Sequence, residues 1–284
     1  GLIGTTASDT VTTVNTWQNC YNLGNITASG ENTLAAGLYG GADSLMQFDS
    51  CYNLGEVSAA TAYGATAPGL SLTNVYYLAG ENLAAGGGTA MTAAQFASGE
   101  AAWALDTENG ATAHKNEWTM AARPEAAENA PAIIPALGEG AYYKVEIVTT
   151  GEGKGSLTVN GNTETCYVNR NDVKIQADPQ SSSSRTKNEL DGLTIAYQNG
   201  QSETINNGSI ITLQGDAVIT AEFGTYQTGS SSNVVGDVNT GNGQTDDGQG
   251  DNPNPGNGQG EGIGNGNGNG GGDVPVIAPP GGTG

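Results

Sequence analysis

Few residues in this chain have side chains suited to nucleophilic or metal chemistry. Its 284 residues include three cysteines, Cys20, Cys51 and Cys166, and one histidine, His114. A thiol nucleophile needs an activating base or cation nearby, and His114 lies more than fifty positions from Cys166. The cysteines show no Cys-x-x-Cys spacing and there is no second histidine, so a zinc site is not expected. We expect His114 to be a surface residue.

Cys20 and Cys51 occupy equivalent positions of a segment that occurs twice. Neighbouring strands lie about 4.8 Å apart, a separation that a disulfide can span. Free cysteine also packs as a small apolar residue, so two stacked, buried thiols are the favoured interpretation. Whether these two residues form a disulfide stays open at the level of the sequence.

Carboxylates are plentiful, and their number alone would allow an acid–base pair for glycan cleavage. The formal charge is −21, and no Lys or Arg precedes Lys115 or follows Lys187. A lyase that acts on acidic sugars needs basic residues to hold them, so the acidic first ninety residues argue against that activity. The same deficit disfavours binding to nucleic acid and to anionic membranes, because phosphates would not be neutralised. No stretch approaches the roughly 18 apolar residues of a membrane span.

Asp43, Asp49 and Glu56 are the candidate calcium ligands, although no D-x-D-x-D loop supports them. The segment 236–239, Gly-Asp-Val-Asn, is similar to the opening of a dockerin calcium loop. It lacks the later acidic ligands and the helix that should follow, so it is not assigned as a calcium site. We assign no catalytic, cofactor-binding or metal-ligating residue, and we do not expect an enzyme.

An internal repeat dominates the first third of the chain. The segment 19–27, Asn-Cys-Tyr-Asn-Leu-Gly-Asn-Ile-Thr, recurs 31 positions later as Ser-Cys-Tyr-Asn-Leu-Gly-Glu-Val-Ser, and a degenerate third copy begins at Asn74. Trp17, Phe48 and Leu72 lie three positions before Cys20, Cys51 and Val75 of the three copies, and a small-residue segment precedes each copy, at 1–4, 37–40 and 69–72. A period of this length is typical of a stacked repeat array, in which Leu and Ile or Val of each copy would point inward.

These residues resemble the GLUG-type repeats of bacterial secreted proteins over about residues 1 to 85. The resemblance implies a right-handed β-helix, and the repeats of that family carry no known active site. Thr92-x-x-Gln95 is a capping box and predicts a helix over 92–106, with Phe96 and Trp103 on one face and Asn-Gly at 109–110 ending it. A closing segment around Trp118 and 131–137 would complete a cap over the last open copy.

From about residue 141 the pattern changes to an independent β unit. Alternation and turn signals predict strands at 143–149, 155–159, 172–177, 193–197, 209–213 and 217–223. The order of these strands, ending in Ile-Thr-Ala-Glu-Phe, resembles the divergent internalin-B-type repeat of Gram-positive surface proteins over about residues 142 to 224. That resemblance implies a small β-rich spacer without catalysis. The Ser-rich insert at 181–184 departs from the short loop that would be expected at that position.

The expected organisation is therefore mainly β: solenoid coils at 1–90, a capping helix and closing segment at 91–140, a β module at 141–224, and a linker at 225–284. The linker is rich in Gly and Asn and is predicted to be disordered, because it cannot bury enough apolar surface. The chain begins within the repeat pattern, which indicates an internal fragment of a longer protein.

We expect a non-catalytic structural or adhesive segment, extracellular, at the bacterial cell surface (a Gram-positive wall being favoured) or secreted. Its partners would be host or matrix glycans or proteins, contacted by exposed aromatics such as Trp17, Tyr39, Tyr63 and Tyr76. Packing within the repeats is the favoured role for each of these four residues. The alternative is an accessory region of a secreted peptidase or glycosidase whose catalytic domain lies outside this sequence.

Overall fold

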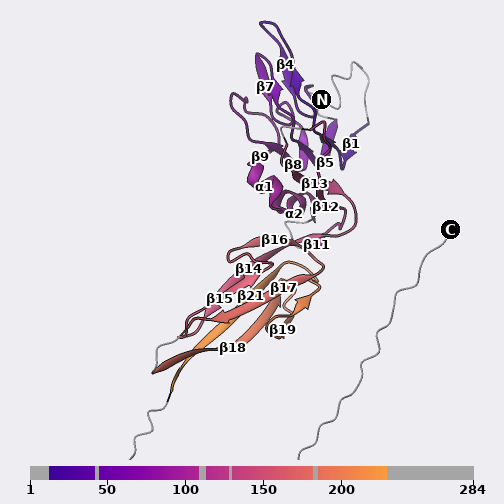
Figure 1. Ribbon diagram of the computed structural model, residues 1–284. Helices are drawn as coiled ribbons and strands as arrows, with labels where there is room; N and C mark the ends of the chain where they lie inside the picture. The colour runs from indigo at the N-terminus through magenta and orange to yellow at the C-terminus, as the bar shows by residue number, and fades with distance from the viewer. Residues whose placement is uncertain (1–12, 42–44, 109–112, 128–129, 182–184, 229–284) are drawn as a thin grey trace, which may run out of the picture. The chain divides into compact units, whose positions relative to one another are not determined.

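The computed structural model describes residues 13–41, 45–108, 113–127, 130–181 and 185–228. They belong to one compact unit that runs to Ser231, and they are mainly β with two short helices (Figure 1). We name three stretches: the repeat region (13–91), the cap (92–137) and the β module (141–228). The predicted linker lies outside the described residues except for 225–228, where the last strand continues. No helix in the described part of the chain has the length and apolar character needed to cross a membrane.

Short parallel strands build the repeat region. In its main sheet, β1 (Asn15–Gln18) and β2 (Tyr21–Asn22) pair with β5 (Met46–Asn53), followed by β8 (Ser71–Leu78) and β9 (Thr89–Met91). Two smaller parallel pairs are β3 (Ile26–Thr27) with β6 (Val57–Ser58) and β4 (Leu34–Ala36) with β7 (Thr61–Tyr63). Each strand therefore stacks on the equivalent strand of another copy.

The pairing register agrees with the sequence repeat at the core motif. Trp17 pairs with Phe48, and Phe48 pairs with Leu72. The third copy is displaced by only 24 positions, because its connecting segments are shorter. The segment 69–72 was expected to be the equivalent of 37–40 in the third copy, and this is wrong. The backbone of 37–40 instead bonds to that of 63–67, as in Leu38 N to Ala65 O at 2.8 Å. Leu72 instead lies within β8.

One backbone position recurs in all three copies. Asn19, Ser50 and Asn74 adopt φ values of 54°, 54° and 50°, the left-handed region that Asn tolerates better than most residues. Each residue precedes the stacked Cys20, Cys51 or Val75 and turns the chain at the same point of the copy. The Asn residues at this position of the motif therefore have a conformational reason.

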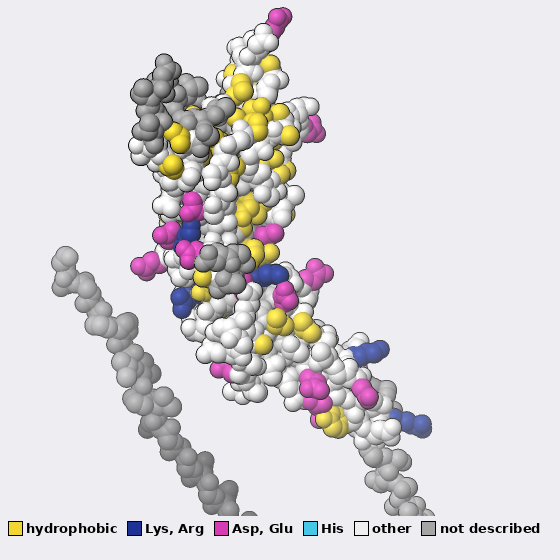
Figure 2. Space-filling view, turned by 180° about the vertical axis from the view of Figure 1, so that it is seen from behind, with side chains coloured by type: hydrophobic (Ala, Val, Ile, Leu, Met, Phe, Trp, Pro, Cys, Tyr) yellow, Lys and Arg dark blue, Asp and Glu magenta, His cyan; other side chains and the backbone are white. Residues whose placement is uncertain are grey.

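Burial in the repeat region is graded along the stack. Of the residues predicted to point inward, Leu54 is buried, whereas Leu23, Ile26 and Val57 are half-buried. A separate apolar cluster lies within the stack, formed by Leu38, Tyr39, Met46, Phe48, Cys51, Ala65 and Val75. In the space-filling view yellow side chains gather over the repeat region (Figure 2).

The cap begins with two helices, where one had been predicted. α1 (Ala93–Ala97) starts at the expected capping box between Thr92 and Gln95, and α2 (Glu100–Asp106) follows Gly99, whose φ is 89°. A Cβ on Gly99 would lie 2.6 Å from the Tyr142 ring, so the chain turns here at a residue that only glycine suits. The predicted stop at 109–110 lies outside the described residues, and α2 ends at Asp106.

Two antiparallel ribbons complete the cap: β10 (Thr107–Glu108) with β11 (Ala113–His114), and β12 (Trp118–Ala122) with β13 (Ile133–Leu137). The cap contacts every described copy of the motif, not only the last one as expected. The Asn19 side chain donates to Glu117, Ser50 donates to Leu105 O, and Asn74 donates to Thr107 O. The cap thus lies along the side of the stack.

A five-stranded sheet and a three-stranded sheet form the β module. The larger sheet has the order β16 (Cys166–Asn169), β14 (Tyr142–Thr150), β21 (Ala217–Gln227), β18 (Thr186–Tyr197), β19 (Ser202–Thr204). The smaller sheet has the order β15 (Gly155–Val159), β17 (Val173–Pro179), β20 (Ile210–Ile211). β14 and β21 are parallel, and the other pairs are antiparallel. One cluster of buried residues lies between them, drawn entirely from residues 141–223.

All six predicted strands of this module exist; β15 has the predicted ends, and the ends of the other five differ. β18 is longer than predicted because it runs beside β21 as far as Thr186, past a bulge between Leu190 and Gly192. β16 and β19 were missed: each is short, and each pairs at an outer edge of the larger sheet. Of the Ser-rich insert, positions 182–184 lie outside the described residues.

Candidate functional site

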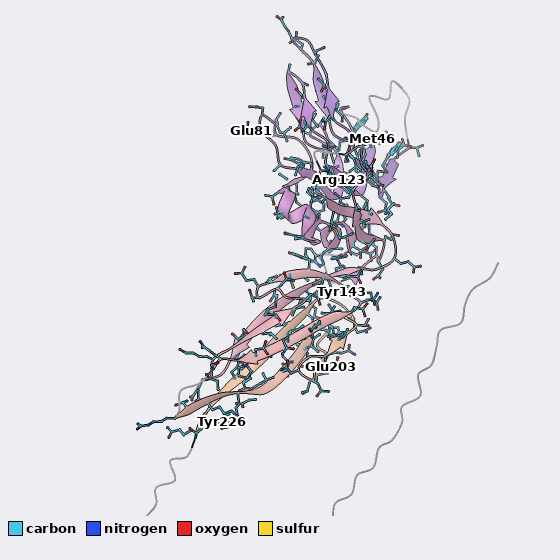
Figure 3. The ribbon with its side chains drawn as sticks, in the orientation of Figure 1. Met46, Glu81, Arg123, Tyr143, Glu203 and Tyr226 are labelled. Carbon is cyan, nitrogen blue, oxygen red and sulfur yellow. The ribbon has the colours of Figure 1, made fainter. Side chains whose placement is uncertain are left out.

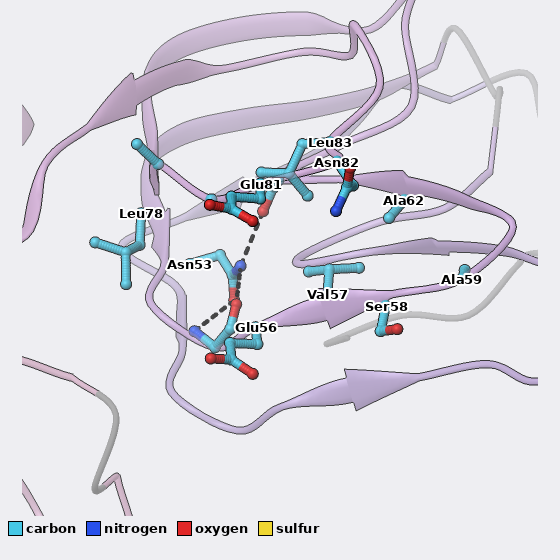
Figure 4. A pocket seen from close by; sticks show the side chains of 14 residues that line it. Asn53, Glu56, Val57, Ser58, Ala59, Ala62, Leu78, Glu81, Asn82 and Leu83 are labelled. Atoms are coloured by element: carbon cyan, nitrogen blue, oxygen red, sulfur yellow. Dashed lines mark hydrogen bonds between the residues drawn. The ribbon is translucent and has the colours of Figure 1, made fainter.

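A groove of about 460 Å³ lies in the repeat region (Figure 4). Its walls are the turn after β5, the strands β6 and β7, and the segment 78–83 that follows β8. In the close-up, Asn53 lies between Glu56 and Glu81. This volume falls in the range of roughly 300 to 1,000 Å³ that is usual for ligand pockets.

The floor of the groove explains the repeated Asn-Leu-Gly motif. The buried Asn53 amide donates to Gly55 O (2.8 Å) and Gly64 O (2.9 Å), while its Oδ1 accepts from Gly55 N (3.1 Å) and from Asn22 Nδ2 (2.7 Å). A Cβ on Gly55 would lie 2.0 Å from Gly24 O. Asparagine therefore closes the turn, and glycine lets successive turns stack closely.

The backbone of β6 is bonded to the preceding copy. Ile26 N donates to Glu56 O, and Ala28 N donates to Ser58 O, so these two carbonyls face β3. Glu56 and Glu81, which line the groove, bring carboxylates to it.

Acidic and neutral residues alone line this groove. Such a lining suits a ligand that carries positive charge or several hydroxyl groups, since it provides acceptors and no cation. Clustering of three or more His, Cys, Asp or Glu suited to a metal ion was not found in the described residues. Among the candidate calcium ligands, Glu56 lines the groove and Asp43 lies outside the described residues.

Asp49, the third of those candidates, is held by the cap. Its Oδ2 lies 2.9 Å from Lys115 Nζ, and Gln18 Nε2 donates to the same oxygen at 3.1 Å. The repeat region has no basic residue of its own, but the fold brings one to it. This ion pair gives Asp49 a structural partner and joins the repeat region to the cap.

The three cysteines are free thiols in the structure. Cys20 and Cys51 stack as expected, with the Cys20 amide donating to Cys51 Sγ at 3.4 Å. Burial raises the pKa of the Cys51 thiol to about 12 and that of Cys166 to about 11. Both thiols therefore stay protonated near neutral pH and are poor nucleophiles. Cys166 belongs to the core of the β module.

His114 is buried, and its expected surface position is wrong. Its side chain is 6% exposed, and its ring lies against Tyr143 with 5.0 Å between ring centroids. Asp106 and Asp216 flank the ring on either side. The sequence patterns did not identify either aspartate as a candidate residue.

The four aromatic residues that could contact a partner differ in exposure. Trp17 is exposed (37%), Tyr63 and Tyr76 are half-buried, and Tyr39 is buried at 1%. Tyr39 therefore packs in the apolar cluster of the stack and is not available for a partner. Tyr21 was not considered; it is 39% exposed and stacks on Tyr52 at 5.2 Å.

The cap also contacts the β module through polar groups. Trp103 Nε1 donates to both carboxylate oxygens of Asp216, at 3.0 and 3.1 Å, and Lys144 N donates to Oδ1 at 2.9 Å. Tyr143, labelled in Figure 3, lies at the end of the module nearest the helices.

Comparison of the chain with protein-family models, with curated proteins and with solved structures found no match.

Proposed function

We propose that this chain is a non-catalytic stalk or spacer segment of a secreted bacterial surface protein. The stacked parallel copies would be the coils of a short β-solenoid, and the cap would hold them against the β module. The observation that carries this proposal is the row formed by Asn19, Ser50 and Asn74. Each copy offers the cap one side chain from this position, so the cap ties the copies together.

Three further features support a stiff spacer. Trp118 is fully buried among tyrosines of the repeat region and donates from its indole nitrogen to Asn19 Oδ1 at 3.2 Å. Tyr52 donates to Pro135 O at 2.6 Å. Trp103 and Asp216 join the cap to the module. Side chains that are both buried and hydrogen-bonded resist local opening, which a spacer under load requires.

A distance measurement between spin labels tests the stiffness. The exposed Glu31 and Glu203 would be replaced by cysteine and labelled in a Cys20→Ser background, since Cys51 and Cys166 are buried thiols with raised pKa values. A stiff spacer gives one narrow distance distribution. The matched control adds Trp103→Ala, which removes the indole donor to Asp216 and should broaden the distribution. A broad distribution in the parent protein would contradict the proposal.

An adhesive role for the same segment would rest on Trp17 and on the groove. Trp17 presents an exposed aromatic ring, and the groove presents acceptors for hydroxyl or cationic groups. Binding to an array of glycans should then be weakened at least tenfold by Trp17→Ala or by Glu81→Gln, with Tyr63→Phe as the control. If the segment binds no glycan, or if both variants bind as the parent does, the adhesive part of the proposal fails and the spacer part remains.

The alternative is an accessory arm of a secreted peptidase or glycosidase. Reading the complete gene on both sides of this sequence separates the two proposals. Further repeats together with a wall-attachment signal would support the stalk. A neighbouring catalytic domain with an intact nucleophile or metal motif would make the segment an accessory arm.

A further inference from the structure

The buried histidine lies between two buried carboxylates that come from different parts of the fold. His114 Nε2 is 3.3 Å from Asp216 Oδ1, and Nδ1 is 3.9 Å from Asp106 Oδ2. Asp106 ends α2 in the cap, whereas Asp216 precedes β21 in the β module. The three side chains are between 0% and 6% exposed. A change in the charge of the imidazole therefore acts on both the cap and the β module, at the contact between them.

Both aspartates behave as acceptors only, which is the pattern of ionised carboxylates. Asp106 accepts from the backbone amides of Asn116, Glu117 and Trp118. Asp216 accepts from Trp103 Nε1 and from the Lys144 amide. Two buried negative charges consequently face the ring of His114.

No lysine or arginine forms a salt bridge with Asp106 or Asp216 within the described residues. Lys115 Nζ pairs with Asp49, and Lys144 Nζ pairs with Glu146. The salt bridges formed by Asp106 and Asp216 in that part of the chain involve His114 alone. A buried charge without a partner is costly, so the imidazole is the group that can offset both.

Tyrosine and other charged groups around the ring do not take over this role. Tyr143, on β14, contacts the ring; burial raises the pKa of its phenol, Arg170 lowers it, and Asp106 and Asp216 raise it. Tyr167, on β16, packs on Trp103, and its pKa is raised by burial and then by Glu100 and Asp216. Both phenols therefore stay neutral near pH 7 and add no charge around the ring.

The hydrogen-bonding state of the ring is incomplete. Among the described residues, neither nitrogen of His114 has a hydrogen-bond partner, although both nitrogens are buried; the 3.3 Å approach of Asp216 Oδ1 to Nε2 does not have the direction of a hydrogen bond. A neutral imidazole has one donor and one acceptor, so one nitrogen would present a lone pair to a carboxylate. The protonated ring has two donors, one for each aspartate.

We propose that His114 is a proton-operated latch between the cap and the β module. The protonated ring pairs with Asp106 and Asp216 and holds the joint closed, and loss of the proton leaves the two carboxylates facing a neutral ring and loosens it. Stability from this source is present at low pH and is lost as pH rises through deprotonation of the ring. Histidine is the side-chain type whose charge most often changes between about pH 5 and 8.

Because His114 is the only histidine, nuclear magnetic resonance can follow its ring in the unmodified chain. We expect the imidazole signals to change as the pH is raised from 5.5 to 8.5, and the Trp103 indole N–H and Lys144 amide signals to change with the same midpoint. The proposal is overturned if the ring keeps one protonation state over this range. It is equally overturned if the ring titrates and the other two signals stay still.

Thermal unfolding of His114→Gln gives a second, independent test. Glutamine cannot be protonated, so the stability advantage of the parent should be larger at pH 5.5 than at pH 8.5, by roughly 2–4 °C in melting temperature or more. Asp216→Asn serves as the matched variant, because it removes one partner and should shrink the pH-dependent part of that advantage. An advantage equal at both pH values, or greater at pH 8.5, would contradict the latch.

Discussion

The repeat region and the β module are both made of strands, yet they pair them over different distances along the chain. In the repeat region Trp17 pairs with Phe48 of the next copy, and the described pairings between named strands are parallel. In the module Val145 pairs with Ala217, bringing the first strand of that part beside its last. The first arrangement repeats a local unit, whereas the second closes a sheet.

Burial follows the same division. The module has one core, drawn entirely from its own residues. The repeat region shares a second cluster with the cap: Tyr52 and Leu54 pack with Phe96, Trp118 and other cap residues. A stack of few copies buries too little surface by itself, so it depends on the cap, while the module depends on its own core.

The largest expected effect is on the module. Phe223→Ala removes a ring that is 1% exposed in that core, and the lost burial together with the cavity should cost about 3–5 kcal/mol in the free energy of unfolding. Urea titration measures this cost. Ile210→Ala, at a residue that is 66% exposed, is the control and should change it by less than about 0.5 kcal/mol. Similar losses for both variants would argue against a single module core.

A smaller effect is expected from the amide that closes the repeat turn. Asn53→Ala leaves the buried Gly64 O and Gly55 N without their partner and should cost about 2–3 kcal/mol. The matched variant is Asn22→Ala, at the equivalent and more exposed position of the preceding copy, with about 1 kcal/mol expected. Thermal unfolding measures both. If the two variants lose the same stability, position within the stack does not matter.

The smallest expected effect is a difference in reactivity between the thiols of the two regions in the native protein. Thiolates react with iodoacetamide, and burial raises the pKa values of Cys51 to about 12 and Cys166 to about 11. At pH 8 we therefore expect Cys20, which is partly exposed, to be modified first, and all three to be modified after unfolding. Mass spectrometry of the labelled peptides checks the order. Rapid native modification of Cys51 would mean that the stack opens readily.

Local patterns predicted much of the secondary structure. The 31-residue repeat gave the register between Trp17 and Phe48, because parallel stacking preserves sequence spacing. Thr92 and Gln95 gave the start of α1, since a capping box involves only neighbouring residues. The strands predicted at 143–149 and 217–223, which correspond to β14 and β21, were visible in the alternation of apolar residues. Each of these signals is contained in one short segment or in its repetition.

The candidate groove was visible only in part. The repeated Asn-Leu-Gly motif identified a turn, but the sequence did not show that Asn53 and Glu56 lie opposite Glu81, because a loop without a pattern brings Glu81 there. The helix break at Gly99 was also missed. Serine and glycine are compatible with a weak helix, and neither the positive φ of Gly99 nor the approach of Tyr142 from another part of the chain can be seen in the local pattern.

By itself the sequence determined which segments repeat, where many strands form and that all basic residues lie between Lys115 and Lys187. Only the tertiary structure decided that the cap lies along three copies, that Lys115 reaches Asp49, and that His114 lies between Asp106 and Asp216. The physical reason is the separation along the chain between the residues that interact. Periodicity and turn chemistry act between neighbouring residues, whereas the charge environment of His114 depends on a carboxylate about a hundred positions away that folding alone brings within 3.3 Å.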